Sequence, residues 1–138
     1  MKEKRIDYGF FVLRALLGLM FFFAGLGKFL TVQRIGNADL ATMIGNIGFP
    51  WPGIFAWILI FSEMVFGLLL LIGWKTKYTV WPLAFILLVA VLGVVIPGSL
   101  AGGALRVLGS TFFFHLIGIT ALILIFIRGP GDYALSRD

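Results

Sequence analysis

The chain has no cysteine, and it has one histidine among 138 residues. Thiolate catalysis, zinc-thiolate sites and iron–sulfur clusters all need cysteine, so they are excluded for this chain. With His115 as the sole histidine, a bis-histidine haem or a two-histidine metal site is excluded within one subunit. The sequence therefore supports no metal site, no haem and no covalent cofactor.

Charge is also scarce. Charged residues make up 12% of the chain, against about 25% in an average soluble protein. Hydrophobic residues make up 61%, which is more apolar surface than one small core can bury. We therefore predict a single integral membrane domain over residues 1–138. The net charge of +5 is read as a membrane signal, and nucleic acid is not expected as a partner.

Four apolar stretches are each long enough to cross a hydrocarbon core, which takes about 20 residues in a helix. They cover roughly 8–29, 53–73, 78–97 and 109–127. Their continuous apolar character disfavours strands, which alternate, so we predict an all-α bundle of four transmembrane helices. The first stretch carries Arg14 and Lys28, which favours a retained helix over a cleaved signal peptide. Pro97 and Gly98 are expected to end the third helix.

The basic residues predict the orientation. Seven lie at the N-terminus, in the 74–77 turn and at the C-terminus, and three lie near the other two connections. Lysine and arginine favour the cytoplasmic side, so both termini are expected there, in a prokaryotic inner membrane with anionic headgroups as partners. The seven are Lys2, Lys4, Arg5, Lys75, Lys77, Arg128 and Arg137.

The long first connection contains a helical pattern. Leu40, Met43, Ile44 and Ile47 follow i, i+3, i+4, i+7 spacing, and Asn37 is a candidate N-cap. This predicts a short interfacial helix over roughly 37–47 that lies on the outer surface like a lid. The alternative is an ordered loop with no lid role.

Four ionisable residues fall inside the predicted spans: Arg14, Lys28, Glu63 and His115. Each costs several kcal/mol at depth if left alone, so each is expected to face the interior and to find a partner. The helical rise puts Arg14 and His115 each about 6 Å in height from Glu63. We therefore predict a string Arg14–Glu63–His115, with Lys28 above it.

One face of the first helix carries Arg14, Gly18, Gly25 and Lys28. The glycines would let a neighbouring backbone or a flat ligand approach. The predicted site has Glu63 and His115 as catalytic residues, and it has Arg14, Gly18, Gly25, Lys28 and His115 as cofactor-binding residues. Structural alternatives stay open: an Arg14–Glu63 ion pair, snorkelling by Arg14 to the inner headgroups and by Lys28 outward, and an interhelical hydrogen bond from His115.

At these residues the sequence resembles the DoxX family of small four-helix membrane proteins. The resemblance rests on the first-helix face with Phe21, on Gly48-Phe49-Pro50-Trp51-Pro52, on Glu63 and Gly67 before Gly73-Trp74-Lys75-Thr76-Lys77, on His115, and on the Gly129-Pro130-Gly131 tail. The ending Ala134-Leu135-Ser136-Arg137-Asp138 departs from the family's Ser-Leu-Asp form. Some relatives are described as membrane subunits of a thiosulfate:quinone oxidoreductase, and others are linked to membrane redox or detoxification complexes.

The resemblance and the buried charges together favour a membrane subunit of a redox system. It would hold a quinone or a similar apolar head group between the first, second and fourth helices. Arg14 and His115 would bind carbonyl oxygens, and Glu63 would move the accompanying proton. Two alternatives are a non-catalytic assembly or anchoring subunit and a small transporter or proton-conducting protein. Partner subunits or a homo-oligomer are expected.

Overall fold

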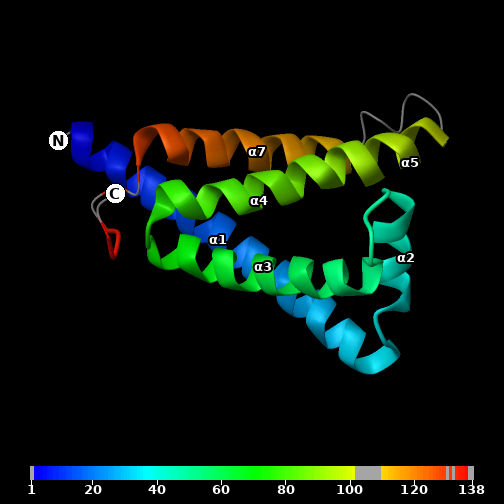
Figure 1. Cartoon of the computed structure of the whole chain (residues 1–138). Coiled ribbons are helices and arrows are strands. Elements are labelled where there is room, and N and C mark those ends of the chain that lie inside the picture. The colour runs from blue at the N-terminus through cyan, green and yellow to red at the C-terminus, as the bar shows by residue number, and fades with distance from the viewer. Residues whose placement is uncertain (1, 102–109, 130, 132, 137–138) are drawn as a thin grey trace.

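The computed structural model describes residues 2–101, 110–129, 131 and 133–136, and every regular element among them is a helix (Figure 1). This confirms the all-α class. The elements are α1 (Lys2–Ile35), α2 (Ala38–Asn46), α3 (Pro52–Ile72), α4 (Thr76–Ala90), the π-helix η1 (Val91–Val95), α5 (Ile96–Ala101) and α7 (Ser110–Arg128).

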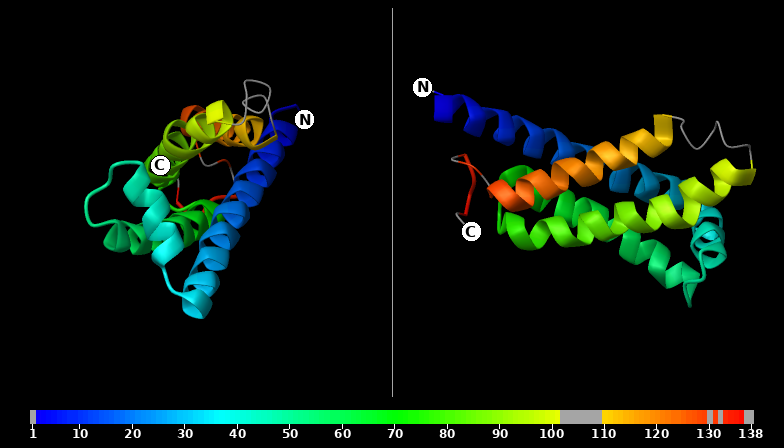
Figure 2. Two further views of the ribbon diagram at one scale, coloured as in Figure 1. Left: turned by 90° about the vertical axis from the view of Figure 1, so that its right-hand side faces the viewer. Right: turned by 90° about the horizontal axis from the view of Figure 1, so that it is seen from above.

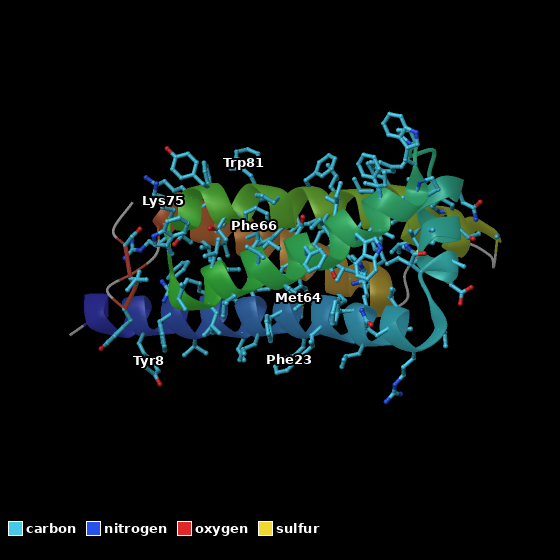
Figure 3. All side chains as sticks on the ribbon, turned by 60° about the horizontal axis from the view of Figure 1, so that its bottom comes forward. Tyr8, Phe23, Met64, Phe66, Lys75 and Trp81 are labelled. Carbon is cyan, nitrogen blue, oxygen red and sulfur yellow. The ribbon has the colours of Figure 1, made fainter. Side chains whose placement is uncertain are left out.

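Three described segments are long and apolar enough to cross a membrane: Tyr8–Ile35, Pro52–Ile72 and Thr76–Gly98. The fourth predicted span corresponds to a shorter apolar helix, Phe112–Arg128, and its predicted start at 109 lies outside the described residues. The arrangement is that of a membrane helical bundle. Large apolar side chains cover its outside, including Tyr8 and Phe23 on α1 and Trp81 on the opposite side of the molecule (Figure 3).

The first helix is longer than predicted. The sequence placed its end near Phe29, but α1 continues to Ile35 and ends where Gly36 adopts a φ of 82°. Residues 30–35 contain polar side chains but no helix breaker, so polarity ends the apolar run without ending the helix. Gly36 supplies the left-handed conformation that closes the last turn.

Helices α3 and α4 form an antiparallel hairpin (Figure 1). Proline at the first position of α3 needs no amide partner, and Gly73, with a φ of 71°, ends the helix. Lys75 also has a positive φ, 42°, and α4 begins at the next residue. Helix α3 lies within one residue of the predicted 53–73 at each end.

The prediction that Pro97 and Gly98 end the third apolar helix is wrong. A π-helical turn, η1, follows α4, and α5 then begins at Ile96 and continues to Ala101. Pro97 therefore lies in the first turn of a new α-helical segment, where its missing N–H needs no partner.

The long helix α1 crosses α3 diagonally, and α4 pairs with α7 (Figures 1 and 2). A core between them is built from side chains of α1, α3, α4 and α7, among them Phe21, Leu70, Leu83 and Leu122. The start of α1 and residues 133–136 lie at one end of the bundle. Helix α2 stands across the other end, roughly perpendicular to α3 (Figure 1).

Candidate functional site

A cavity of about 430 Å³ lies between α3 and the α4–η1 segment, and residues of α2 line one end of it. We call it the main cavity. Its walls are mostly apolar, with Phe55 and Leu59 from α3 and Phe85 and Ile86 from α4. The sequence analysis placed a ligand between the first, second and fourth helical spans. Helix α4 is the third span, so its large contribution to the cavity wall corrects that prediction.

Lys28 and Glu63 form the ion pair in the wall of this cavity. The Lys28 Nζ donates a hydrogen bond to the Glu63 Oε2 at 2.5 Å. The Glu63 side chain is 7% exposed and the Lys28 side chain is 33% exposed. Pairing offsets the cost of holding either charge at depth.

This pair corrects two predictions. Glu63 pairs with Lys28 and not with Arg14, and Lys28 does not snorkel outward. Gly25 meets the backbone of Ile60 and Met64, so Glu63 lies beside Gly25, and the Lys28 side chain reaches back by about one turn of α1 to its carboxylate. The height estimate failed because it counted from Tyr8 as if this residue were level with the C-terminal end of α3, whereas α1 meets that end near Arg14 and Gly18.

Arg14 lies at the other end of the bundle, away from the main cavity, and is 1% exposed. Its Nη2 donates to the carbonyl oxygen of Tyr133 at 2.9 Å. The guanidinium also contacts Gly73 at the C-terminal end of α3, where the helix dipole favours a cation. Gly73 is ten residues from Glu63, which is about 15 Å along a helix, so the predicted string Arg14–Glu63–His115 is wrong.

The tail that Arg14 holds also caps α3. The amide of Leu135 donates to the Ile72 carbonyl at 3.1 Å, and the amide of Ser136 donates to the Gly73 carbonyl at 3.3 Å. The last carbonyls of a helix have no partner within the helix, so these bonds satisfy two of them from elsewhere in the chain. The sequence analysis gave this tail no role.

Gly18 and Gly25 contact α3 directly. A Cβ atom on Gly18 would lie 2.6 Å from the Leu71 nitrogen, and one on Gly25 would lie 2.9 Å from the Ile60 oxygen. The sequence analysis considered either a neighbouring backbone or a flat ligand against this face of α1. The backbone of α3 lies there. Neither glycine lines the main cavity, so the cavity does not support their predicted role in cofactor binding.

His115 is half-buried on α7, and its ring meets that of Phe114 edge-on, with 5.9 Å between the centroids. It lines the main cavity together with Lys28 and Glu63. Three of the four ionisable residues found from the sequence thus share one cavity. Their helices are α1, α3 and α7, so the fold brings together residues far apart in the chain.

Helix α2 lines one end of the cavity with three of the four apolar residues that the spacing predicted, and the fourth, Leu40, lines a separate hollow between α1 and α2. Met43, Ile44 and Ile47 line the cavity. Asn37 occupies the N-cap position of α2 as predicted, but its side chain makes no capping hydrogen bond, and its Nδ2 donates to the Gly53 carbonyl at 3.4 Å.

The π-helix η1 packs against the C-terminal end of α2, and the sequence analysis did not predict this contact. A Cβ on Gly93 would lie 2.6 Å from the Ile47 Cγ2, so Ile47 rests on the bare backbone of η1. The absence of a side chain at Gly93 within an apolar run was the available signal. The π-helical turn itself has no sequence signature.

Comparison with known proteins gives one family. The DoxX family model matches residues 9–96, which is more than half of the chain. The match includes Arg14, Lys28 and Glu63 and leaves out His115. No curated protein and no solved structure matches the chain. This membrane protein therefore belongs to the DoxX family.

Proposed function

We propose that this DoxX-family protein binds a quinone or a similar apolar molecule with a polar head in the main cavity, as a membrane subunit of a redox system. One observation carries the proposal: Lys28, Glu63 and His115 line the same apolar cavity. Ligand sites are commonly apolar hollows of this size with a few convergent polar groups. Ionisable residues inside membrane spans commonly mark such sites.

Each polar group has a role in this proposal. The Lys28 ammonium and the His115 imidazole donate hydrogen bonds to the carbonyl oxygens of the head group. Glu63 supplies or accepts the proton that accompanies reduction or oxidation of the ligand. Electrons arrive through a partner subunit, since the chain has no cysteine for a thiolate or cluster centre.

The membrane setting is part of the proposal. The basic residues support cytoplasmic termini in a prokaryotic inner membrane, with α2 lying in the outer interface over the cavity. The carboxylate of Asp39 and the amide of Asn46 are on the exposed side of α2, while Ile44 is buried. This division is the one expected of a helix with one face on water or headgroups.

Quinone binding by the purified protein in lipid nanodiscs tests the proposal. The variant Glu63→Gln removes the charge but keeps the shape, and we expect it to weaken binding or turnover by about tenfold or more, as the loss of a hydrogen bond to a charged group does. The variant Arg34→Gln, at an exposed position outside the cavity, should leave both unchanged. Equal binding and turnover in the wild type and Glu63→Gln would exclude the proton role.

A second candidate is a non-catalytic assembly or anchoring subunit. The Lys28–Glu63 pair and the glycine contacts between α1 and α3 favour it, because both fix the register of two helices without requiring a ligand. In that case the double variant Lys28→Met/Glu63→Leu should still co-purify with the partner subunits. Loss of quinone binding with full complex recovery would assign the pair to the ligand.

A further inference from the structure

A second hollow, the α1–α2 groove, lies between α1 and α2. It holds about 530 Å³, and its walls include Ala24, Gly27 and Thr31 from α1 and Asp39 from α2. It also includes Phe23, which projects from the outer side of α1 (Figure 3). The groove is separate from the main cavity but shares Lys28 and Met43 with it.

The groove runs from the end of α1 down to the buried ion pair. Gly36 and Asp39, both exposed, lie where α1 gives way to α2, and Lys28 is eight residues before Gly36. Eight residues correspond to about 12 Å along the helix. A Cβ on Gly27 or on Gly36 would meet no atom within 4 Å, so both positions border open space.

Lys28 lines both hollows, so the ion pair is part of the wall between them. A third of the Lys28 side chain is exposed, whereas Glu63 is nearly covered. A partly exposed ammonium at membrane depth is stable where water or polar groups reach its open side. Asp39 and the hydroxyl of Thr31 place polar atoms along the same groove.

We propose that the α1–α2 groove is a water-filled route from the membrane surface to the Lys28–Glu63 pair, through which Glu63 exchanges protons with the aqueous phase. Water in the groove protonates the Glu63 carboxylate, and the resulting acid passes that proton to a ligand in the main cavity, which restores the carboxylate paired with Lys28. The role of the proton rests on the proposed function. The presence of water in the groove does not.

The cysteine-free chain allows a direct test by labelling single cysteines in membrane vesicles. A charged methanethiosulfonate reagent reacts with thiolates, and thiolates form only where water reaches. We expect Ala24→Cys and Thr31→Cys to label about tenfold faster or more than Leu30→Cys. Leu30 is beside Thr31 in the chain and 52% exposed, but it does not line the groove.

A blocking variant tests the route itself. Gly27→Trp fills the groove between Ala24 and the surface and should slow labelling of Ala24→Cys, again by about tenfold. Gly9→Trp is the matched control, because a Cβ there also meets nothing within 4 Å and Gly9 is not in the groove. Gly9→Trp should leave the rate unchanged.

The outcomes separate the two proposals. Equal labelling at the groove and at Leu30→Cys, or labelling only by an uncharged membrane-soluble maleimide, means that lipid fills the groove, and this overturns the water route. Fast groove labelling in a protein that binds no quinone supports the route and counts against the proposed function. Quinone binding with no groove labelling supports the proposed function and overturns the water route.

Discussion

Glu63 is an acidic residue that is almost fully buried within an apolar helix. It lies near the middle of α3, where an unpaired acidic residue costs about 2.5–3.5 kcal/mol on insertion scales. The contact with Lys28 offsets that cost, and each partner therefore depends on the other. The pair also leaves the carboxylate at the cavity wall, so the same interaction stabilises the helices and takes part in the proposed ligand site.

The first prediction concerns this dependence. Glu63→Leu alone should lower the free energy of unfolding by about 3–5 kcal/mol, because it leaves the Lys28 ammonium without its counter-ion. The double variant Lys28→Met/Glu63→Leu should recover most of that loss, because both charges are gone. Unfolding in mixed micelles measures both. Additive losses in the double variant would show that the two charges are not coupled.

The identities of the buried ionisable residues follow from the sequence, because a charged residue in an apolar run is visible without a structure. Their pairing does not follow. Depth counted along each helix cannot say which residues of α1 face which residues of α3. That depends on the crossing of the two helices, which is set by the close backbone contacts that Gly18, Gly25 and Gly67 each make with the facing helix.

At the scale of helices, the crossing of α1 and α3 is made by backbone meeting backbone. A Cβ on Gly67 would lie 2.6 Å from the Phe22 nitrogen and 2.9 Å from the Gly18 oxygen. Near Gly25, Met64 projects from α3 toward α1 (Figure 3). Small residues at such crossings replace the hydrophobic driving force that is weak between helices in lipid.

The second prediction tests this crossing. Gly67→Ala should destabilise the protein by about 1–3 kcal/mol, because the added methyl group must push the two backbones apart. Gly27→Ala is the control on α1, where a Cβ meets open space, and it should be neutral or stabilising. Thermal unfolding in detergent compares the two. Equal stability of both variants would contradict the close crossing.

The boundaries of the helices were predictable where a residue type enforces them. Pro52 and Gly73 bracket α3 in the sequence as they do in the structure. The end of α1 was missed because Gly36, not the loss of hydropathy, is what ends it. The π-helix at Val91–Val95 was missed because no residue type dictates an i→i+5 turn in an apolar run.

For the whole molecule, the two ends of the bundle differ in structure: one contains the main cavity, and the other contains the contacts between Arg14 and the tail. One end holds α2 over the main cavity and Ile47 on Gly93. At the other end, the α3–α4 turn and residues 133–136 lie close together (Figure 2), and Arg14 of α1 contacts both through Gly73 and the Tyr133 carbonyl. Arg14 was predicted as part of the ligand site. Its partner in the tail could not be predicted, because residues 133–136 follow no helical or strand periodicity.

The third prediction separates the two ends. Arg14→Met keeps the bulk of the side chain but removes its donors, so amide hydrogen exchange at Leu135 and Ser136 should rise about tenfold or more. Exchange along α2 should stay as in the wild type. Arg34→Met, at an exposed position, is the control. Unchanged exchange in the tail would mean that Arg14 does not hold it.

The bond from Arg14 to Tyr133 joins residues 119 positions apart. During synthesis α1 is made before its carbonyl partner exists, and every other described helix must be inserted before the two can meet. Closing so long a loop is slow compared with forming local contacts. The Arg14–Tyr133 contact is therefore expected to be among the last to form, so it reports that assembly of the bundle has finished.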